Sequence, residues 1–298
     1  MRVFVTGATG FIGSAVVKEL ITAGHEVLGL ARSLEKATAL LNTGAAVHRG
    51  SLENLQDLTH AAAQCDGVIH LAFNHDFSKF VANCEDDRQV IRALGSALSG
   101  SGRPLIVTSG TAIANTVPGA PAKEDHSALS SEANPRAASE EAAAALAADG
   151  VNVSVVRLPQ VHDTARQGLV SYAIAMFREQ GICSFVGEGH NRWPAAHVLD
   201  VAHLYRLAIE RAEPSARYHA VAEEGVLFRD IVEAVGRRLR LPVTSVSPEA
   251  IETRFGWLSA FMTHSMPASS DQTRKKLRWE PAGPGLIADL DRLQLSEG

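Results

Sequence analysis

Three glycines near the N-terminus have the spacing of a phosphate-binding loop. The stretch 5–13 reads VTGATGFIG and separates a short apolar run from an amphipathic helical pattern. Gly7 permits a tight turn, Gly10 lets the backbone approach a pyrophosphate, and Gly13 lets the following helix pack closely. The free N–H groups at the start of that helix attract phosphate. The pattern therefore predicts dinucleotide binding, and a tight strand–helix turn without a ligand is the alternative.

The end of the second apolar run indicates which dinucleotide binds. Residues 27–33 read VLGLARS, whereas an acid that binds the ribose 2′-hydroxyl is typical of NAD-binding proteins at this place. Arg32 can instead pair with a 2′-phosphate, and Ser33 can add a hydrogen bond. We therefore expect NADP(H) in preference to NAD(H). A solvated arginine and an N-cap serine would produce the same pattern.

The elements that position these residues alternate along the first half of the chain. Short β-branched runs predict strands at 2–6, 26–31, 46–49, 67–72, 104–109 and 151–158. Helical patterns lie between them, at 11–23, 33–41, 52–63, within 77–98 and in an alanine-rich stretch reaching about residue 149. This alternation predicts an α/β fold, a doubly wound parallel sheet of the Rossmann type.

The second half of the chain is less regular. It contains helical patterns at 167–179, 198–211 and 227–239, a short strand at 218–222, and short helices over the last 50 residues. We expect a dinucleotide-binding domain over residues 1–160. Residues 161–298 should form a smaller, mixed substrate-binding region that is partly interleaved with the sheet domain.

Composition and charge narrow the class of protein. The chain of 298 residues has a net charge of −5, and its basic residues are scattered rather than clustered, so we expect no nucleic-acid partner. We also find no apolar run long enough for a membrane span and no signal peptide. The three cysteines lack CxxC spacing, which favours reduced thiols, a cytoplasmic location and no metal site.

The ordered set of motifs resembles the extended short-chain dehydrogenase/reductase family, in its epimerase/dehydratase-like branch. The segments that carry the resemblance are VTGATGFIG at 5–13, DGVIHLAF at 66–73, LIVTSGTA at 105–112, VVRLPQVH at 155–162 and GEGHNRWPAAHVLDVAHL at 187–204. The resemblance and the glycine motif together imply a set of cofactor contacts: Thr6, Gly7, Thr9, Gly10, Phe11, Ile12, Gly13, Arg32, Ser33, Ser51, Leu52, Leu71, Ala72, Phe73, Pro159 and Val161.

The same resemblance makes the segment 134–141, NPRAASEE, a candidate part of the active site. The family carries Tyr-x-x-x-Lys on this helix, and the alignment places Arg136 at the tyrosine and Glu140 at the lysine. No tyrosine of this chain is followed four residues later by lysine. Arg136 stays protonated, so it can bind a carboxylate or a developing oxyanion but cannot serve as an ordinary general acid. An exposed i,i+4 ion pair between Arg136 and Glu140 is the alternative.

Other polar residues are candidates for the remaining roles. A strict count puts Gly110 at the family's catalytic hydroxyl, so Ser109 or Thr111 would have to substitute. His75 and His162 follow predicted strands and are candidate proton donors, although each also fits a structural role. Candidate substrate contacts are Asn74, His75, Arg136, Trp193 and His197.

Three functions are compatible with these features. The first is an NADP-dependent oxidoreductase that transfers hydride to a carbonyl, imine or activated double bond of a small organic molecule. The second is a nucleotide-sugar epimerase or dehydratase, which the missing Tyr-x-x-x-Lys disfavours. The third is a non-catalytic NADP-binding regulator or sensor. For all three we expect a small-molecule ligand and a monomer or homodimer.

Overall fold

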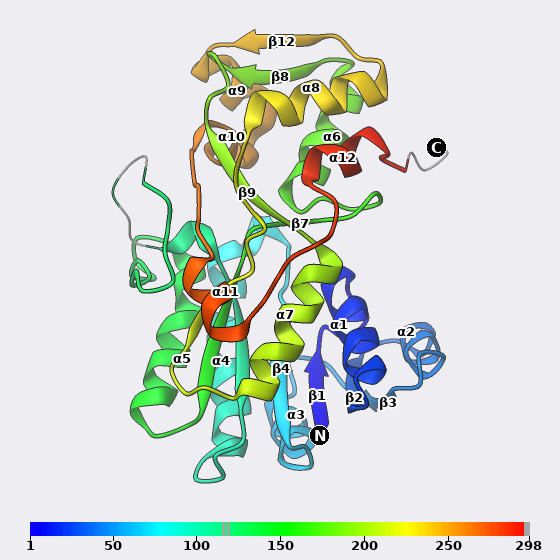
Figure 1. Ribbon diagram of the computed structural model, residues 1–298, viewed down its shortest axis with the longest axis vertical. Coiled ribbons are helices and arrows are strands. Elements are labelled where there is room, and N and C mark those ends of the chain that lie inside the picture. The colour runs from blue at the N-terminus through cyan, green and yellow to red at the C-terminus, as the bar shows by residue number, and fades with distance from the viewer. Residues whose placement is uncertain (115–116, 118–119, 295–298) are drawn as a thin grey trace.

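A seven-stranded parallel sheet forms the centre of the molecule in the computed structural model, which describes residues 1–114, 117 and 120–294 (Figure 1). The strand order is β10-β6-β5-β4-β1-β2-β3. The strands are β1 (Arg2–Thr6), β2 (Glu26–Ala31), β3 (Ala46–Arg49), β4 (Gly67–His70), β5 (Leu105–Gly110), β6 (Val153–Leu158) and β10 (Arg217–His219). The predicted Rossmann-type α/β fold is confirmed.

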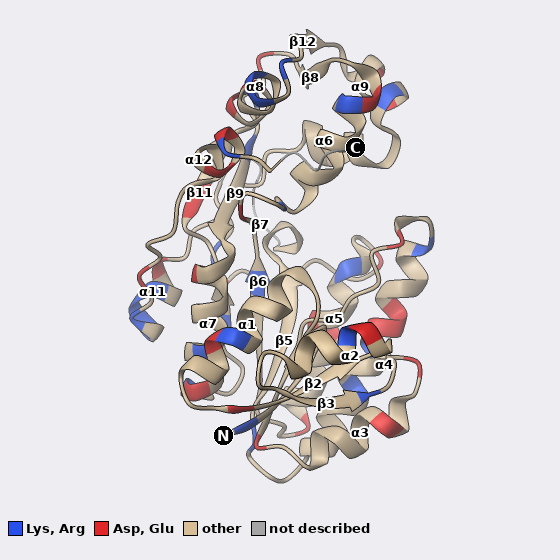
Figure 2. Ribbon diagram, turned by 90° about the vertical axis from the view of Figure 1, so that its right-hand side faces the viewer, with Lys and Arg blue, Asp and Glu red and all other residues tan. Residues whose placement is uncertain are grey.

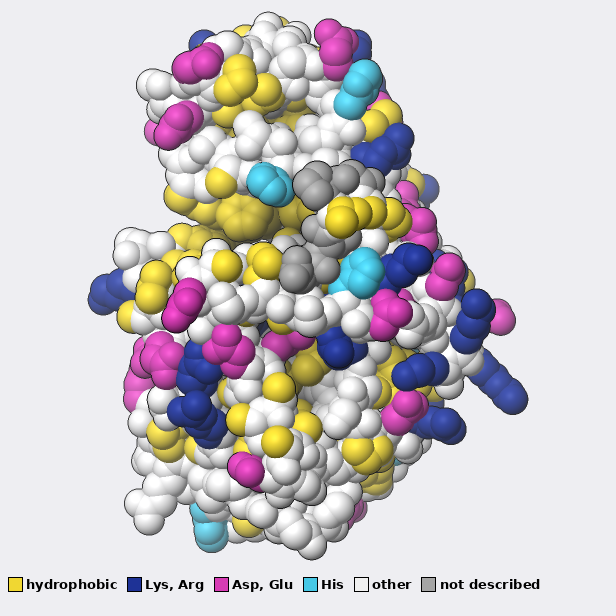
Figure 3. All heavy atoms as spheres, turned by 90° about the vertical axis from the view of Figure 1, so that its left-hand side faces the viewer, with side chains coloured by type: hydrophobic (Ala, Val, Ile, Leu, Met, Phe, Trp, Pro, Cys, Tyr) yellow, Lys and Arg dark blue, Asp and Glu magenta, His cyan; other side chains and the backbone are white. Residues whose placement is uncertain are grey.

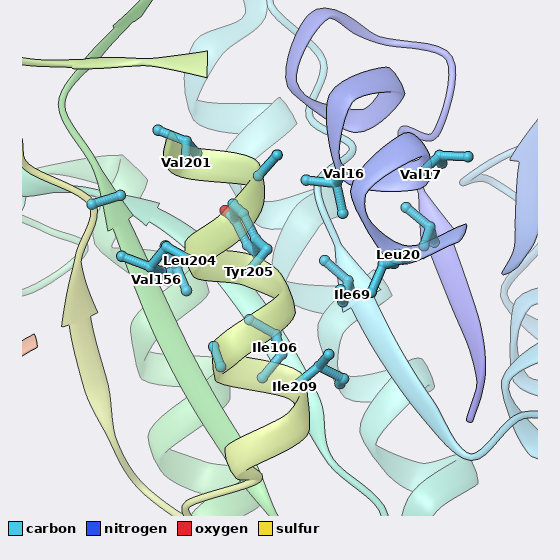
Figure 4. Packing of buried hydrophobic residues seen from close by; sticks show 14 of the residues in the cluster. Val16, Val17, Leu20, Ile69, Ile106, Val156, Val201, Leu204, Tyr205 and Ile209 are labelled. Carbon is cyan, nitrogen blue, oxygen red and sulfur yellow. The ribbon is translucent and has the colours of Figure 1, made fainter. Parts of the chain in front are cut away.

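Helices cover both faces of this sheet. On one face α1 (Phe11–Thr22) and α7 (Val198–Arg211) pack together over Ile69, Ile106 and Val156 (Figure 4). The other face is covered by α3 (Leu55–Ala63), α4 (Phe80–Leu98) and α5 (Ala138–Ala148). The short helix α2 (Leu34–Leu41) connects β2 to β3. The apolar stripes of these helices account for the two main cores, as expected for an open sheet with both faces buried.

The C-terminal part has a core of its own, above the carboxyl ends of the strands in Figure 1. Its helices are α6 (Leu169–Gln180), α8 (Phe228–Leu239), α9 (Pro248–Phe255), α10 (Ser259–Thr263) and α12 (Leu286–Asp291). Two small sheets accompany them, one of β7 (Gln160–His162), β9 (Arg192–His197) and β11 (Glu223–Leu227), the other of β8 (Cys183–Val186) and β12 (Val243–Val246). Sequence patterns did not predict the strands of these small sheets.

Two later segments return to the main sheet. Helix α7 packs against α1, and β10 pairs with β6 in parallel, with Tyr218 opposite Val156. The short helix α11 (Asp271–Leu277) lies against both α7 and β10. The expected boundary near residue 160 therefore falls between β6 and β7, and the chain crosses between the two parts more than once.

A hollow separates the C-terminal part from the sheet domain, and hydrophobic side chains gather on its floor (Figure 3). Acidic and basic residues are interspersed along the ribbon rather than grouped by sign (Figure 2). None of the helices described here has the length and apolar character needed to cross a membrane.

Candidate active site

The glycine loop joins β1 to α1 and has the shape that the sequence predicts. Gly7 has a φ of +67°, and a Cβ atom placed on it would lie 2.8 Å from the backbone nitrogen of Ala72. A Cβ on Gly13 would collide with the carbonyl oxygen of Gly7. Gly10 is the N-cap of α1, so the helix directs its first N–H groups toward this loop. The loop is therefore a narrow backbone cradle beside the start of a helix.

The neighbouring ends of β2 and β3 present two arginines rather than one. Arg32 is exposed directly after β2, and Ser33 caps α2 by accepting a hydrogen bond of 3.2 Å from the Lys36 nitrogen. Arg49, at the end of β3, is also exposed, and its backbone pairs with Ala31. Arg49 was not predicted as a site residue. The parallel register of β2 and β3 was the signal that could have found it.

A buried chain of hydrogen bonds begins at the glycine loop. Thr6 Oγ1 lies 2.7 Å from His70 Nδ1, and His70 Nε2 lies 2.9 Å from Asp87 Oδ1. Since a carboxylate only accepts, His70 donates from Nε2, and its Nδ1 then accepts from Thr6. The Thr6 hydroxyl in turn accepts from the Ala72 N–H at 3.3 Å. His70 is buried, as expected, and it connects the loop to α4.

Asp87 holds Arg136 at the other end of this chain. Arg136 lies in the 3-10 helix η3 (Pro135–Ala137), and its Nη1 donates to Asp87 Oδ2 at 3.1 Å and to the Ser139 hydroxyl. Its Nη2 donates to the Thr108 carbonyl oxygen at 2.9 Å. Burial opposes ionisation of Asp87, but the hydrogen bond from His70 and the charge of Arg136 together keep the pKa of this carboxyl below its ordinary value. Sequence reasoning missed Asp87.

Glu140 has a different partner, so the alternative of an exposed ion pair between Arg136 and Glu140 is ruled out. Arg157 donates from Nε and Nη2 to the two carboxylate oxygens of Glu140, at 2.7 and 2.8 Å. Both side chains are buried, with exposed fractions of 0% and 7%. Arg157 also donates to the His126 carbonyl oxygen. Arg157 thus occupies both carboxylate oxygens of Glu140, which disfavours a contact between Glu140 and the cofactor.

Phe73 and His75 lie beside Arg136, in the segment that follows β4. The Arg136 guanidinium carbon is 4.3 Å from the centroid of the Phe73 ring, and the His75 ring meets Phe73 edge-on at 5.3 Å. Partial burial and the charge of Arg136 both lower the pKa of His75. Asn74 is turned toward α4, where its Nδ2 donates to Asn83 Oδ1 at 3.2 Å. The structure thus brings together three of the predicted residues: Arg136, Phe73 and His75.

The two candidate hydroxyls lie at the end of β5. Ser109 is buried, and its Oγ has no hydrogen-bond partner among the described residues. Thr111 begins the 3-10 helix η2 (Thr111–Ile113), and within the described part of the chain its hydroxyl makes only a long bond of 3.4 Å to the Leu158 carbonyl oxygen. The Thr108 hydroxyl is engaged by Tyr205 at 2.7 Å, and burial raises the pKa of that tyrosine. At this strand end, the hydroxyls of Ser109 and Thr111 are therefore more available to a ligand than that of Thr108.

The remaining catalytic and substrate candidates lie in the C-terminal part. His162 is fully buried, with Nδ1 2.7 Å from Asp289 Oδ2, and burial lowers its pKa. His197 caps α7 through its Nδ1 and lies beside His162, with ring centroids 5.8 Å apart. Trp193 is also buried, and its indole nitrogen donates to the Phe261 carbonyl oxygen at 3.2 Å. These contacts give Trp193 a packing role, whereas part of the His197 side chain is exposed.

The other predicted cofactor residues differ in how deeply they are buried. Thr9, Phe11, Ile12, Ser51, Leu52, Leu71, Ala72 and Pro159 are half-buried. Val161 is 4% exposed and packs in the core shared with α1 and α7. The described residues contain no group of three His, Cys, Asp or Glu side chains placed to hold a metal ion.

Aromatic rings from distant parts of the chain meet next to Phe73. The centroid of Phe77, in the 3-10 helix η1 (Phe77–Lys79), lies 4.1 Å from Trp257, in η4 (Gly256–Leu258), and the two rings are stacked. Tyr172 of α6 meets Phe77 edge-on at 5.7 Å. We call the following six residues the aromatic cluster: Phe73, His75, Phe77, Phe80, Tyr172 and Trp257.

Comparison with known proteins agrees with this architecture. The chain belongs to the NAD dependent epimerase/dehydratase family, whose model matches residues 3–221. It is 43% identical over 291 residues to the uncharacterized protein C2A9.02 of Schizosaccharomyces pombe, covering 97% of this chain and 98% of that protein. It is 31% identical over 229 residues to the 2-alkyl-3-oxoalkanoate reductase of Stenotrophomonas maltophilia, covering 72% and 67% of the two chains.

Among solved structures, the fold is similar to that of DesIV, a dTDP-glucose 4,6-dehydratase from Streptomyces venezuelae determined with NAD and TYD bound. The TM-score is 0.78 at 17% identity, with 98% of this chain and 95% of that chain covered. At this identity the likeness concerns the fold. The glycine loop and the family together define an NAD(P)-binding Rossmann fold.

Proposed function

We propose that the protein is an NADP(H)-dependent oxidoreductase that reduces a carbonyl, imine or activated double bond of a small organic molecule. The observation that carries the proposal is the fixed position of Arg136. Its guanidinium is held by Asp87 and the Thr108 carbonyl oxygen at the carboxyl end of the sheet, where α/β proteins bind their ligands. Asp87 and His70 connect it to the glycine loop.

The cofactor preference rests on the two arginines at the ends of β2 and β3. Arg32 follows Ala31, and Arg49 is the register partner of Ala31, so two exposed cations occupy the edge where a ribose 2′-phosphate would bind. The 2′-phosphate of NADP can form ion pairs with both arginines, whereas the uncharged 2′-hydroxyl of NAD cannot. Ser33 is committed to capping α2 and can keep that role while its hydroxyl hydrogen remains free to donate.

The residues around Arg136 suit the reduction of a polar double bond. Bound NADPH supplies the hydride. The Arg136 guanidinium can stabilise the negative charge that develops on the substrate oxygen or nitrogen, because the guanidinium is fixed in advance by its protein partners. His75 can donate the proton, and Ser109 or Thr111 can hydrogen-bond the substrate. Arg136 itself keeps its proton and stabilises charge only.

This assignment predicts how the rate depends on pH. The acid form of His75 is required, and its pKa lies below the ordinary value of about 6.5. We therefore expect kcat/KM to rise as pH falls toward that pKa and to decline above it. His75→Gln should flatten the profile, whereas His60→Gln, at an exposed histidine on α3, should leave it unchanged. A profile unaffected by His75→Gln would transfer the donor role to another group.

A nucleotide-sugar epimerase or dehydratase is the second candidate, favoured by the fold similarity to DesIV. That chemistry requires an efficient base at a sugar hydroxyl. Arg136 cannot provide one, and burial also lowers the pKa of His162 while enclosing it away from the surface. A non-catalytic NADP-binding sensor is the third candidate, and the cofactor loop alone would suffice for it.

Two measurements test the proposal. The melting temperature should rise more with NADPH than with NADH, and Arg32→Ala combined with Arg49→Ala should abolish the difference; no rise with either cofactor would contradict all three candidates. NADPH oxidation is then followed with ketones, enones and imines. We expect Arg136→Gln to reduce kcat by about 100-fold with cofactor binding kept, by analogy with loss of an oxyanion donor. Binding without turnover across the panel would favour the sensor.

A further inference from the structure

The aromatic cluster occupies one side of the candidate site and forms a continuous path away from Arg136. Arg136 lies over Phe73 at 4.3 Å, and Phe73 meets His75 at 5.3 Å. His75 meets Phe77 at 6.2 Å, and Phe77 stacks on Trp257 at 4.1 Å. The path therefore begins at the fixed cation and ends in the C-terminal part of the molecule.

Folding does not account for the outer rings of this cluster. Tyr172 and Trp257 are 38% and 39% exposed, whereas the other two tryptophans, Trp193 and Trp279, are buried and donate their indole N–H groups to backbone carbonyls. Adjacent exposed aromatic rings keep a large apolar area in water, and such patches mark binding sites more often than chance placement does. Tyr172 and Trp257 are themselves in contact, at 5.4 Å.

We propose that the aromatic cluster binds the planar ring of an aromatic or ring-conjugated carbonyl compound, with the carbonyl group directed toward Arg136. The inference rests on the proposed reductase function and gives its substrate class. Flat rings gain from both stacked and edge-on contacts, and the exposed parts of Tyr172 and Trp257, whose ring planes are 80° apart, offer both orientations.

The chemistry of the cluster disfavours a nucleotide sugar as the occupant. A diphosphate needs cationic partners, and a pyranose needs hydrogen-bonding groups for its hydroxyls. Within the part of the chain that the structure describes, Arg136 is the one cation found over a ring of this cluster, and Asp87 already neutralises it. A neutral, polarised carbonyl can accept from Arg136 without adding a second full charge.

Binding of a matched pair of ketones tests the inference without catalysis. Acetophenone and cyclohexyl methyl ketone share one carbon skeleton, but only the first is planar. Their affinities for the full-length protein are measured by calorimetry, with and without NADP⁺, and UDP-glucose is the third ligand. We expect acetophenone to bind at least about threefold more tightly than its saturated analogue. Equal affinities, or tighter binding of UDP-glucose, would overturn the inference.

Variants then assign the preference to the cluster. Trp257→Leu should reduce acetophenone affinity by about threefold to tenfold, and Trp257→Phe should retain most of it, because the ring rather than the indole N–H is needed. Leu41→Ala is the matched control, since Leu41 is 57% exposed on α2, outside the cluster. If Trp257→Leu bound acetophenone with unchanged affinity, the ring of the ligand would bind elsewhere and the proposal would be refuted.

The outcome separates this inference from the proposed function. Preferential binding of acetophenone without NADPH oxidation by any carbonyl compound would keep the ring site and refute the reductase. NADPH oxidation with equal kcat/KM for acetophenone and its saturated analogue would keep the reductase and refute the ring site.

Discussion

Asp87 has three polar side-chain neighbours in a buried position, His70, Arg136 and Ser139, and therefore controls more than one feature of the site. It accepts from His70 and Arg136 and is 3% exposed. We expect Asp87→Asn to lower the free energy of unfolding by about 3–5 kcal/mol, because Arg136 would lose its counter-ion in a buried setting. Urea denaturation measures the loss.

Asp86→Asn is the matched control for this change. Asp86 is the neighbouring, exposed carboxylate on α4, and surface substitutions of this kind usually alter stability by less than about 0.5 kcal/mol. Equal stability of the two variants would show that Arg136 does not depend on Asp87.

The buried ion pair between Glu140 and Arg157 predicts that the protein will not tolerate lysine, the family's residue at this position, in place of Glu140. Glu140→Lys would place an ammonium group against the guanidinium of Arg157, which is 0% exposed. We expect a loss of at least about 3–5 kcal/mol, or no folded protein at all. The double change Glu140→Lys with Arg157→Glu restores opposite charges and should recover part of the loss. If the double mutant recovered no stability relative to Glu140→Lys, the result would argue against direct pairing of residues 140 and 157.

At the scale of elements, Gly13 decides how closely α1 approaches β1. A methyl group at this position would collide with the Gly7 carbonyl oxygen. We expect Gly13→Ala to lower stability by about 1–3 kcal/mol and to remove the NADPH-induced rise in melting temperature, since the loop would have to open. Ser14→Ala, on the exposed side of the same helix, should retain that rise. If NADPH raised the melting temperature of Gly13→Ala by the normal amount, cofactor binding would not depend on the close packing of the glycine loop.

The main elements and the glycine loop were predictable from sequence, because periodicity and glycine spacing act locally. The small strands β8, β9, β11 and β12 were missed, since their four to six residues show no clear alternation. Arg136 was identified as a site candidate, but its true partner is 49 positions away in sequence. One signal was available, because Asp87 interrupts the buried stripe of α4 formed by Cys84, Ile91 and Leu94.

At the scale of the whole molecule, His219 makes stability depend on pH. Burial and the charge of Arg157 lower its pKa to about 3, against about 6.5 in an unfolded chain. The unfolded state therefore binds the proton first, and the free energy of unfolding falls as pH decreases from about 6.5 to 3. The contribution is at most about 1.4 kcal/mol per pH unit.

His219→Asn should make that decline shallower, because the amide can replace the Nδ1 donor to the Ser269 carbonyl oxygen without titrating. Chemical denaturation at several pH values provides the comparison. His264→Asn, at an exposed histidine, should follow the parent protein. An identical pH dependence in His219→Asn would show that other groups govern acid stability.

The return of the chain to the main sheet predicts that residues 1–160 do not fold alone. That fragment lacks α7, which covers one face of the sheet, and β10, which pairs with β6. We expect the fragment to aggregate or to unfold without a cooperative transition, as followed by circular dichroism against the full chain. A cooperative transition with an NADPH response would contradict this expectation.

The position of β10 also sets the order of events during protein synthesis. Strand β6 ends at Leu158, but its partner β10 begins only at Arg217. At roughly 5–20 residues per second, a ribosome needs several seconds to make the intervening segment. Throughout that interval the nascent chain carries an apolar parallel strand with an open edge, so its dependence on chaperones should be concentrated in this window of translation.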